Sequence, residues 1–220
     1  MTSDLDPAEQ ARANAWAAEA AAERADRART AMREHTAERI PPQFRNASVA
    51  DPVVRDWVQA LVAITAEDRR DGEVPRVRRG RSLLIAGPTG TGKTWHAFGA
   101  MKALNDAGVW ADWERVTAAD LYAALRPRPG VDSEAVFRHW LRCAVLIVDD
   151  LAAAKLSEWT EEVTFRLVNY RYEHHKPTVF TTNVPLPGLP ERLGERTASR
   201  LHEMCVFATL KGSDQRRRQS

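Results

Sequence analysis

The stretch GPTGTGKT at residues 87–94 decides the fold of this chain. It follows an apolar run, Ser82–Ala86, that is typical of a buried strand, and it precedes a helix-like segment, residues 95–104. The spacing G-x-x-x-x-G-K-[ST] between a strand and a helix is typical of a P-loop, which binds the phosphates of a nucleotide. A glycine-rich turn that matches by chance is the alternative, and the flanking strand and helix argue against it.

Each residue type in this loop suits phosphate binding. The glycines let the backbone turn tightly so that its N–H groups point at a phosphate, and the positive end of the following helix adds to the attraction. Lys93 is expected to reach the β- and γ-phosphates of ATP, and the Thr94 hydroxyl to bind Mg²⁺. The predicted nucleotide-binding residues of the loop are Gly87, Pro88, Thr89, Gly90, Thr91, Gly92, Lys93 and Thr94.

The rest of the chain alternates between strand-like and helix-like segments. Further strands are expected at Val109–Glu114, Cys143–Val148, Thr178–Thr182 and Met204–Ala208. Further helices are expected at Pro7–Glu38, from Asp51 to Val62, and at Thr117–Leu125, Ser133–Leu141, Ser157–His174 and Glu191–Leu201. This alternation predicts an α/β fold with three layers, α/β/α, around a parallel five-stranded sheet.

The N-terminal segment differs in composition from the rest. It is rich in Ala, Arg and Glu and has few large apolar residues, so it is expected to form a solvated single helix, or else a partner-binding arm or a short coiled coil. The prolines in Ile40-Pro41-Pro42 end any helix there. We therefore expect a helical arm at 1–39, a linker and helix at 40–80, and an ATPase domain at 81–220.

Bulk composition excludes several classes of protein. The formal net charge of +2 gives no general sign of a nucleic-acid binder, although arginines cluster locally. The two cysteines, Cys143 and Cys205, lie beside or within apolar runs, and no Cys/His spacing resembles a zinc site. No signal peptide or membrane-length apolar run is present, so a cytoplasmic protein without membrane contact is expected.

Polar residues follow the later strands, where the ligand crevice of an open α/β sheet lies. Asp149 is placed to hold Mg²⁺ together with Thr94, and Asp150 to polarise the attacking water as general base. Asn183, after the next strand, could orient that water. Arginines such as Arg196 and Arg200 usually form surface ion pairs, but one offered to a neighbouring subunit's γ-phosphate would act as an arginine finger.

Several stretches together resemble one family. These are IPPQFRNA at 40–47, LLIAGPTGTGKT at 83–94, VLIVDDL at 145–151, EW at 158–159, NYRYE at 169–173, PTVFTTN at 177–183, GER at 194–196, SRL at 199–201 and GSDQR at 212–216. In this order they are similar to the DnaC/IstB-type AAA+ ATPases, which include loaders of replicative helicases and helpers of transposition.

The resemblance implies roles for individual residues. Asn183 would be sensor 1, Arg200 the arginine finger and Arg216 the sensor 2 residue, with Arg196 as a second candidate finger. The cofactors would be ATP and Mg²⁺. The chain would assemble as a homo-oligomer on single-stranded DNA and engage a replicative helicase, with arginines between about Leu121 and Leu141 near the DNA.

Other functions stay open at this stage. An IstB-like helper would instead act on duplex DNA with a transposase. The arm lacks the cysteines with which some loaders bind zinc, so the partner is not fixed. A small-molecule P-loop kinase gives no role to Asn183 or Arg200. A nucleotide-gated adaptor that does not hydrolyse ATP is kept open by Asp150, which stands where most AAA+ proteins have a longer glutamate.

Overall fold

A computed structural model describes residues 6–68, 74–130, 132–153 and 157–212 of the chain. Its centre is a five-stranded sheet in the order β2-β3-β4-β1-β5, and all neighbouring strands are parallel. The strands are β1 (Ser82–Ala86), β2 (Trp113–Thr117), β3 (Val145–Asp149), β4 (Thr178–Thr182) and β5 (Cys205–Thr209). The predicted α/β/α fold with a parallel five-stranded sheet is therefore confirmed.

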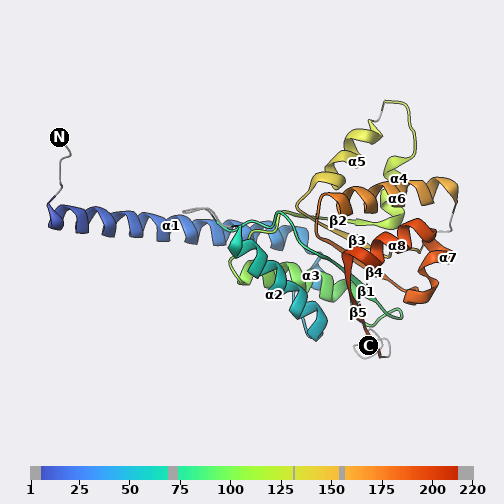
Figure 1. Cartoon of the computed structure of the whole chain (residues 1–220), viewed down its shortest axis with the longest axis horizontal. Helices are drawn as coiled ribbons and strands as arrows, with labels where there is room; N and C mark the ends of the chain where they lie inside the picture. Colours follow the sequence, from blue (N-terminus) through green and yellow to red (C-terminus); the bar gives the residue numbers. More distant parts are fainter. Residues whose placement is uncertain (1–5, 69–73, 131, 154–156, 213–220) are drawn as a thin grey trace.

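Helices cover both faces of the sheet, as Figure 1 shows. They are α1 (Pro7–Arg39), α2 (Pro52–Glu67), α3 (Lys93–Asp106), α4 (Ala118–Leu125), α5 (Ser133–Arg142), α6 (Glu158–Glu173), α7 (Leu189–Leu193) and α8 (Glu195–Met204), with 3₁₀ turns η1 (Pro42–Phe44) and η2 (Leu186–Gly188). Because both faces are covered, β1, β3 and β4 are buried along their whole length, which explains their continuous apolar or threonine-rich sequences.

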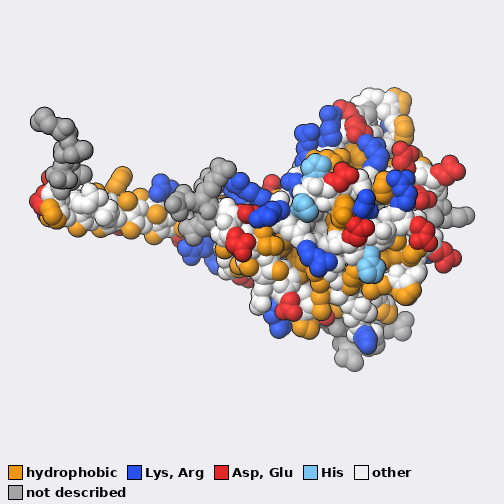
Figure 2. All heavy atoms as spheres, in the orientation of Figure 1, with side chains coloured by type: hydrophobic (Ala, Val, Ile, Leu, Met, Phe, Trp, Pro, Cys, Tyr) orange, Lys and Arg blue, Asp and Glu red, His pale blue; other side chains and the backbone are white. Residues whose placement is uncertain are grey.

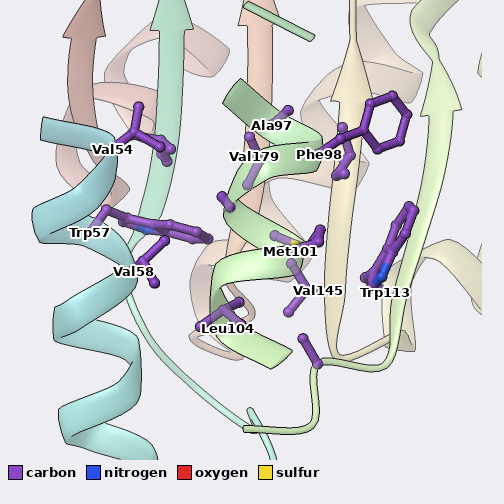
Figure 3. Close-up of a cluster of buried hydrophobic side chains, with 14 of the residues drawn as sticks. Val54, Trp57, Val58, Ala97, Phe98, Met101, Leu104, Trp113, Val145 and Val179 are labelled. Carbon is purple, nitrogen blue, oxygen red and sulfur yellow. The ribbon is translucent and has the colours of Figure 1, made fainter. Parts of the chain in front are cut away.

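Two hydrophobic cores lie on opposite faces of the sheet. On one face, side chains of α2 and α3 pack against alternate residues of the strands, such as Val145 and Val179 (Figure 3). On the other face, α4 to α8 pack against the intervening residues, such as Leu146 and Phe180. The alternation along β3 and β4 thus produces the three layers.

Among the predicted elements, one strand and one helix differ most from the structure. The second strand begins at Trp113, because the residues before it, although alternately buried, form an extended loop in which Trp110 bridges only to Arg76. The helix predicted at Glu191–Leu201 is two helices, since Gly194 adopts a φ of 83° between α7 and α8. A Cβ at this glycine would lie 2.2 Å from Oε1 of Glu161.

Several local signals were correct. Thr117 caps α4 by accepting a hydrogen bond from the Asp120 amide, and Ser157 caps α6 in a capping box with Thr160. Gly108 follows α3 with a φ of 76°, as expected of a C′ glycine. The first helix ends at Arg39, before the two prolines.

Helix α1 projects from the body of the molecule (Figure 1), and its exposed part carries mainly alanine and charged side chains (Figure 2). Only its C-terminal part is buried. There the Asn105 side chain of α3 donates to the Met32 carbonyl and to the Thr36 hydroxyl, which also accepts from Trp113 Nε1 at 3.2 Å. Trp16, near the other end, is 74% exposed. The domain limits stay a prediction.

None of the helices in the described part of the chain combines the length and hydropathy of a membrane-spanning segment.

Candidate functional site

The P-loop lies between β1 and α3, and its glycines are required by the backbone. Gly90 and Gly92 have φ values of 82° and 89°, in the region that favours glycine. A Cβ at Gly87 would lie 2.6 Å from the Leu210 carbonyl oxygen, in the segment that follows β5. The loop therefore packs closely against its surroundings and ends at Lys93, the first residue of α3.

Lys93 links the loop to the end of β4. Its side chain is buried and its Nζ donates to the carbonyls of Gly87 and Pro88, each at 2.9 Å. The same Nζ donates to Oδ1 of Asn183 at 2.5 Å. The structure thus brings together two of the predicted site residues. Lys93 follows β1 through the P-loop and Asn183 follows β4, and these two strands are parallel neighbours.

Thr94 and Asp149 also meet. The Thr94 hydroxyl donates to Asp149 Oδ1 at 3.0 Å, and Asp149 is the last residue of β3. Both groups present oxygen atoms beside the P-loop, which suits Mg²⁺, a cation held in nucleotide sites by few protein oxygens together with phosphates. The described residues contain no cluster of three or more His, Cys, Asp or Glu side chains that could hold a metal ion.

Thr181 of β4 organises the acidic pair and was not singled out from the sequence. Its hydroxyl donates to Asp149 Oδ1 at 2.5 Å and accepts from the Asp150 amide at 2.9 Å. Asp150 has a φ of 56°, which is uncommon for a residue with a side chain, and it is exposed beyond the strand end. Such backbone conformations are held by their surroundings and cluster at functional sites.

Arg115 is a second residue that sequence reasoning missed. It lies in β2, next to β3, and its Nη2 donates to Asp149 Oδ2 at 2.6 Å. The predicted strand ended at Glu114, which left Arg115 outside it. With the observed strand, Thr117 pairs with Asp149 in register, so Arg115 lies two residues earlier on the neighbouring strand. A correct prediction of the pairing register between β2 and β3 would have placed Arg115 near Asp149.

His96, on the first turn of α3, ties the P-loop to α2. Its Nδ1 lies 2.8 Å from the Gly92 carbonyl, and its Nε2 lies 3.3 Å from the Asp51 amide. Because the Asp51 amide can only donate, Nε2 is the acceptor and Nδ1 carries the proton toward Gly92. The N-terminal end of α2, which Asp51 caps, is therefore held against the loop.

The two candidate fingers lie on α8 and contact α6 rather than the P-loop. The guanidinium of Arg196 lies over the Phe165 ring at 4.0 Å, and that of Arg200 over the Tyr172 ring at 4.5 Å. Arg200 also donates to Glu203, at 3.2 Å. A hydrogen bond from Tyr172 is the main cause that lowers the pKa of Glu203; desolvation opposes it, and the Arg200 charge lowers this pKa further.

The remaining predicted residues are distributed as follows. Pro88 and Thr89 are exposed, Gly90 is half-buried, and the buried Thr91 donates to the Pro88 carbonyl at 2.9 Å. Arg216, the predicted sensor 2 residue, lies outside the described residues.

Several solved structures have the same fold as this chain. The crystal structure of the DnaC helicase loader matches with a TM-score of 0.60 and 25% identity, over 78% of this chain and 100% of that chain. The DnaI structure matches with a TM-score of 0.60 and 19% identity, over 80% and 94%. The replication initiator DnaA, bound to AMPPCP and single-stranded DNA, matches with a TM-score of 0.59 and 17% identity, over 79% and 51%.

Sequence comparisons agree with this fold. The phage-like element PBSX protein XkdC of Bacillus subtilis (strain 168) is 31% identical over 87 residues, which are 36% of this chain and only 32% of that protein. The family model of IstB-like ATP binding proteins matches residues 73–220, which include the P-loop, both aspartates and Asn183. The chain therefore belongs to the family of IstB-like ATP binding proteins, with an AAA+ fold like that of DnaC.

Proposed function

We propose that this chain is a Mg²⁺-dependent ATPase. The observation that carries the proposal is the convergence of four side chains from three places in the chain. Lys93 bonds to Asn183, and Thr94 bonds to Asp149, at the C-terminal ends of adjacent strands. Such a set can bind a nucleoside triphosphate and act on its terminal phosphate.

Each side chain has a role in this proposal. Lys93 turns from the loop carbonyls to the β- and γ-phosphates, while Thr94 and Asp149 hold Mg²⁺. The bound Mg²⁺ would neutralise charge on the phosphate oxygens. Asp150, exposed beside the site, accepts the proton of the attacking water, and Asn183 orients that water or the γ-phosphate.

The finger comes from a second subunit in this proposal. Arg200 lies on α8, with its guanidinium over the Tyr172 ring of α6 and donating to Glu203. A homo-oligomer would present this surface to the next subunit's γ-phosphate and complete the site there.

We further propose that the ATPase works as a helicase loader, assembling on single-stranded DNA and engaging a replicative helicase. The similarity to the DnaC helicase loader over that protein's whole solved chain supports this. The family model supports the second candidate, an IstB-like helper that acts on duplex DNA with a transposase.

One experiment tests both levels. ATP turnover is measured alone, with single-stranded DNA and with duplex DNA, for the wild type and for Lys93→Ala. We expect turnover that requires Lys93. Stimulation by single-stranded DNA, and a complex with the replicative helicase of the same organism in size-exclusion chromatography, support the loader. Stimulation by duplex DNA, and a complex with a transposase encoded beside the gene, support the helper. Equal turnover by Lys93→Ala overturns the ATPase proposal.

A further inference from the structure

The Asp149 carboxylate has a positively charged partner in the protein itself. Its side chain is only 3% exposed, and both oxygens accept hydrogen bonds. Oδ1 accepts from the hydroxyls of Thr94 and Thr181, whereas Oδ2 accepts from the Arg115 guanidinium at 2.6 Å. The hydroxyls are neutral, so Arg115 supplies the positive charge that a buried carboxylate needs.

Arg115 is held beside this carboxylate but can leave it. It lies on β2, adjacent to β3, and its guanidinium carbon is 5.7 Å from the centre of the Phe98 ring. Its side chain is 31% exposed, so it has access to solvent, unlike Asp149. The ion pair can therefore open on the side of Oδ2 without unfolding the strand.

We propose that Arg115 is the resident counter-ion of Asp149 and keeps a divalent cation out of this site until a nucleotide arrives. The inference rests on the proposed role of Asp149 in holding Mg²⁺. With Arg115 in place, the carboxylate is already neutralised, and a divalent cation that approaches it meets a like charge. Thr94 and Asp149 alone then bind the cation weakly, and the phosphates of ATP must supply the missing negative charge.

The inference predicts that removing the guanidinium creates a metal site in the nucleotide-free protein. The test uses Mn²⁺, whose free and bound forms are distinguished by electron paramagnetic resonance, with the full chain and no nucleotide. Arg115→Met keeps the length and apolar stem of the side chain. We expect it to bind one Mn²⁺ at least about tenfold more tightly than the wild type, because removal of one nearby positive charge is worth more than a factor of ten.

Matched variants separate this effect from general changes. Arg142→Met removes an exposed arginine at the end of α5 and should bind Mn²⁺ as the wild type does. Arg115→Lys keeps the charge and should also bind as the wild type does. Arg115→Met combined with Asp149→Asn should lose the gained site. If Arg115→Met gains no Mn²⁺ affinity, or gains it equally in the Asp149→Asn background, the inference is wrong.

Thermal unfolding gives a second readout, which stays informative if Arg115→Met is less stable. Its melting temperature should rise on addition of Mn²⁺ without nucleotide, whereas that of the wild type should not. Binding of a fluorescent ATP analogue to the wild type is measured separately. If that binding fails, the proposed function fails; if ATP binds but Mn²⁺ shifts neither protein, only the role of Arg115 is overturned.

Discussion

Lys93 and Asn183, ninety positions apart in the chain, are joined by a 2.5 Å hydrogen bond from Nζ to Oδ1. The bond closes the P-loop onto the end of β4. The group proposed to bind the γ-phosphate and the group proposed to sense it therefore lie in direct contact.

Replacing Asn183 tests its proposed part in hydrolysis. We expect Asn183→Ala to lower kcat by roughly 10²-fold, as for loss of an aligned polar group at a reacting centre, while ATP is still bound. Asn169→Ala removes an amide on α6 that donates to Glu173, and it should leave kcat unchanged. Equal kcat values for Asn183→Ala and the wild type would remove Asn183 from the site. Steady-state turnover and equilibrium binding of a labelled nucleotide provide the measurements.

Replacement of Arg200 should lower kcat more than replacement of Arg196, the other arginine of α8. Arg200 is paired to the charged Glu203 and stacked on Tyr172, whereas Arg196 is more exposed and stacked on Phe165. We expect Arg200→Ala to reduce kcat by about 10³-fold or more, with ATP affinity retained, since a finger acts only in the transition state. Arg196→Ala is the matched control on the same helix. A larger loss in Arg196→Ala would reassign the finger.

The buried hydroxyl of Thr36 takes part in the attachment of α1 to the body of the molecule. Thr36 accepts from both Asn105 and Trp113, so Thr36→Val leaves the buried Trp113 Nε1 without this acceptor and Asn105 Nδ2 with only the Met32 carbonyl. We expect the free energy of unfolding to fall by about 1–3 kcal/mol, measured by denaturant titration. Thr30→Val, at an exposed position of the same helix, should change it by less than about 0.5 kcal/mol. Equal effects of the two would show that the network adds no stability.

Both cysteines should be unreactive in the folded protein. Burial raises the pKa of Cys205 far above its ordinary value of 9.0, and burial also raises that of Cys143, where the nearby Arg171 charge partly opposes the increase. At pH 8 both are therefore thiols, and a disulfide reagent should label Cys205 more slowly than the partly exposed Cys143.

The raised pKa of Cys205 makes the stability of the folded protein depend on pH. Because the folded-state pKa of Cys205 lies above its unfolded value, its contribution to stability is complete below about pH 9 and is lost as the pH rises further. The labelling rates of the Cys143→Ser and Cys205→Ser single variants are measured between pH 7 and 9 in roughly half-unit steps, with unfolded chain as reference. Each variant reports the reactivity of the one cysteine that it retains. Rapid labelling of Cys205 in the folded protein would contradict its burial.

Much of the fold followed from sequence because the signals were local. The P-loop lies between a buried strand and a helix, and the apolar run before Asp149 required a central strand. Since parallel strands end at one edge of a sheet, Asp149 and Asn183 had to approach residues 87–94.

The residues that sequence missed depend on register and packing. Arg115 reaches Asp149 because it lies within β2, which pairs with β3. The alternating pattern that predicted a strand from Val109 belongs to the loop before β2. Thr181 joins Asp149 and Asp150 through its hydroxyl. In the sequence alone, Thr181 looks like an ordinary buried residue of β4. The Thr36 hydroxyl, in an alanine-rich helix, is one of the groups that hold α1 against the body of the molecule. Nothing in the sequence distinguishes Thr36 from the other polar residues of this helix.

The central claim is an ATPase site shared between two subunits, and mixing two inactive variants tests it most directly. Lys93→Ala cannot bind the phosphates productively, and Arg200→Ala cannot supply the finger. In a mixture, an Arg200→Ala subunit provides Lys93 and its Lys93→Ala neighbour provides Arg200, so roughly a quarter of the interfaces would be complete. We predict that each variant alone is inactive and that the equimolar mixture recovers ATP turnover. A mixture as inactive as its components would contradict the shared site.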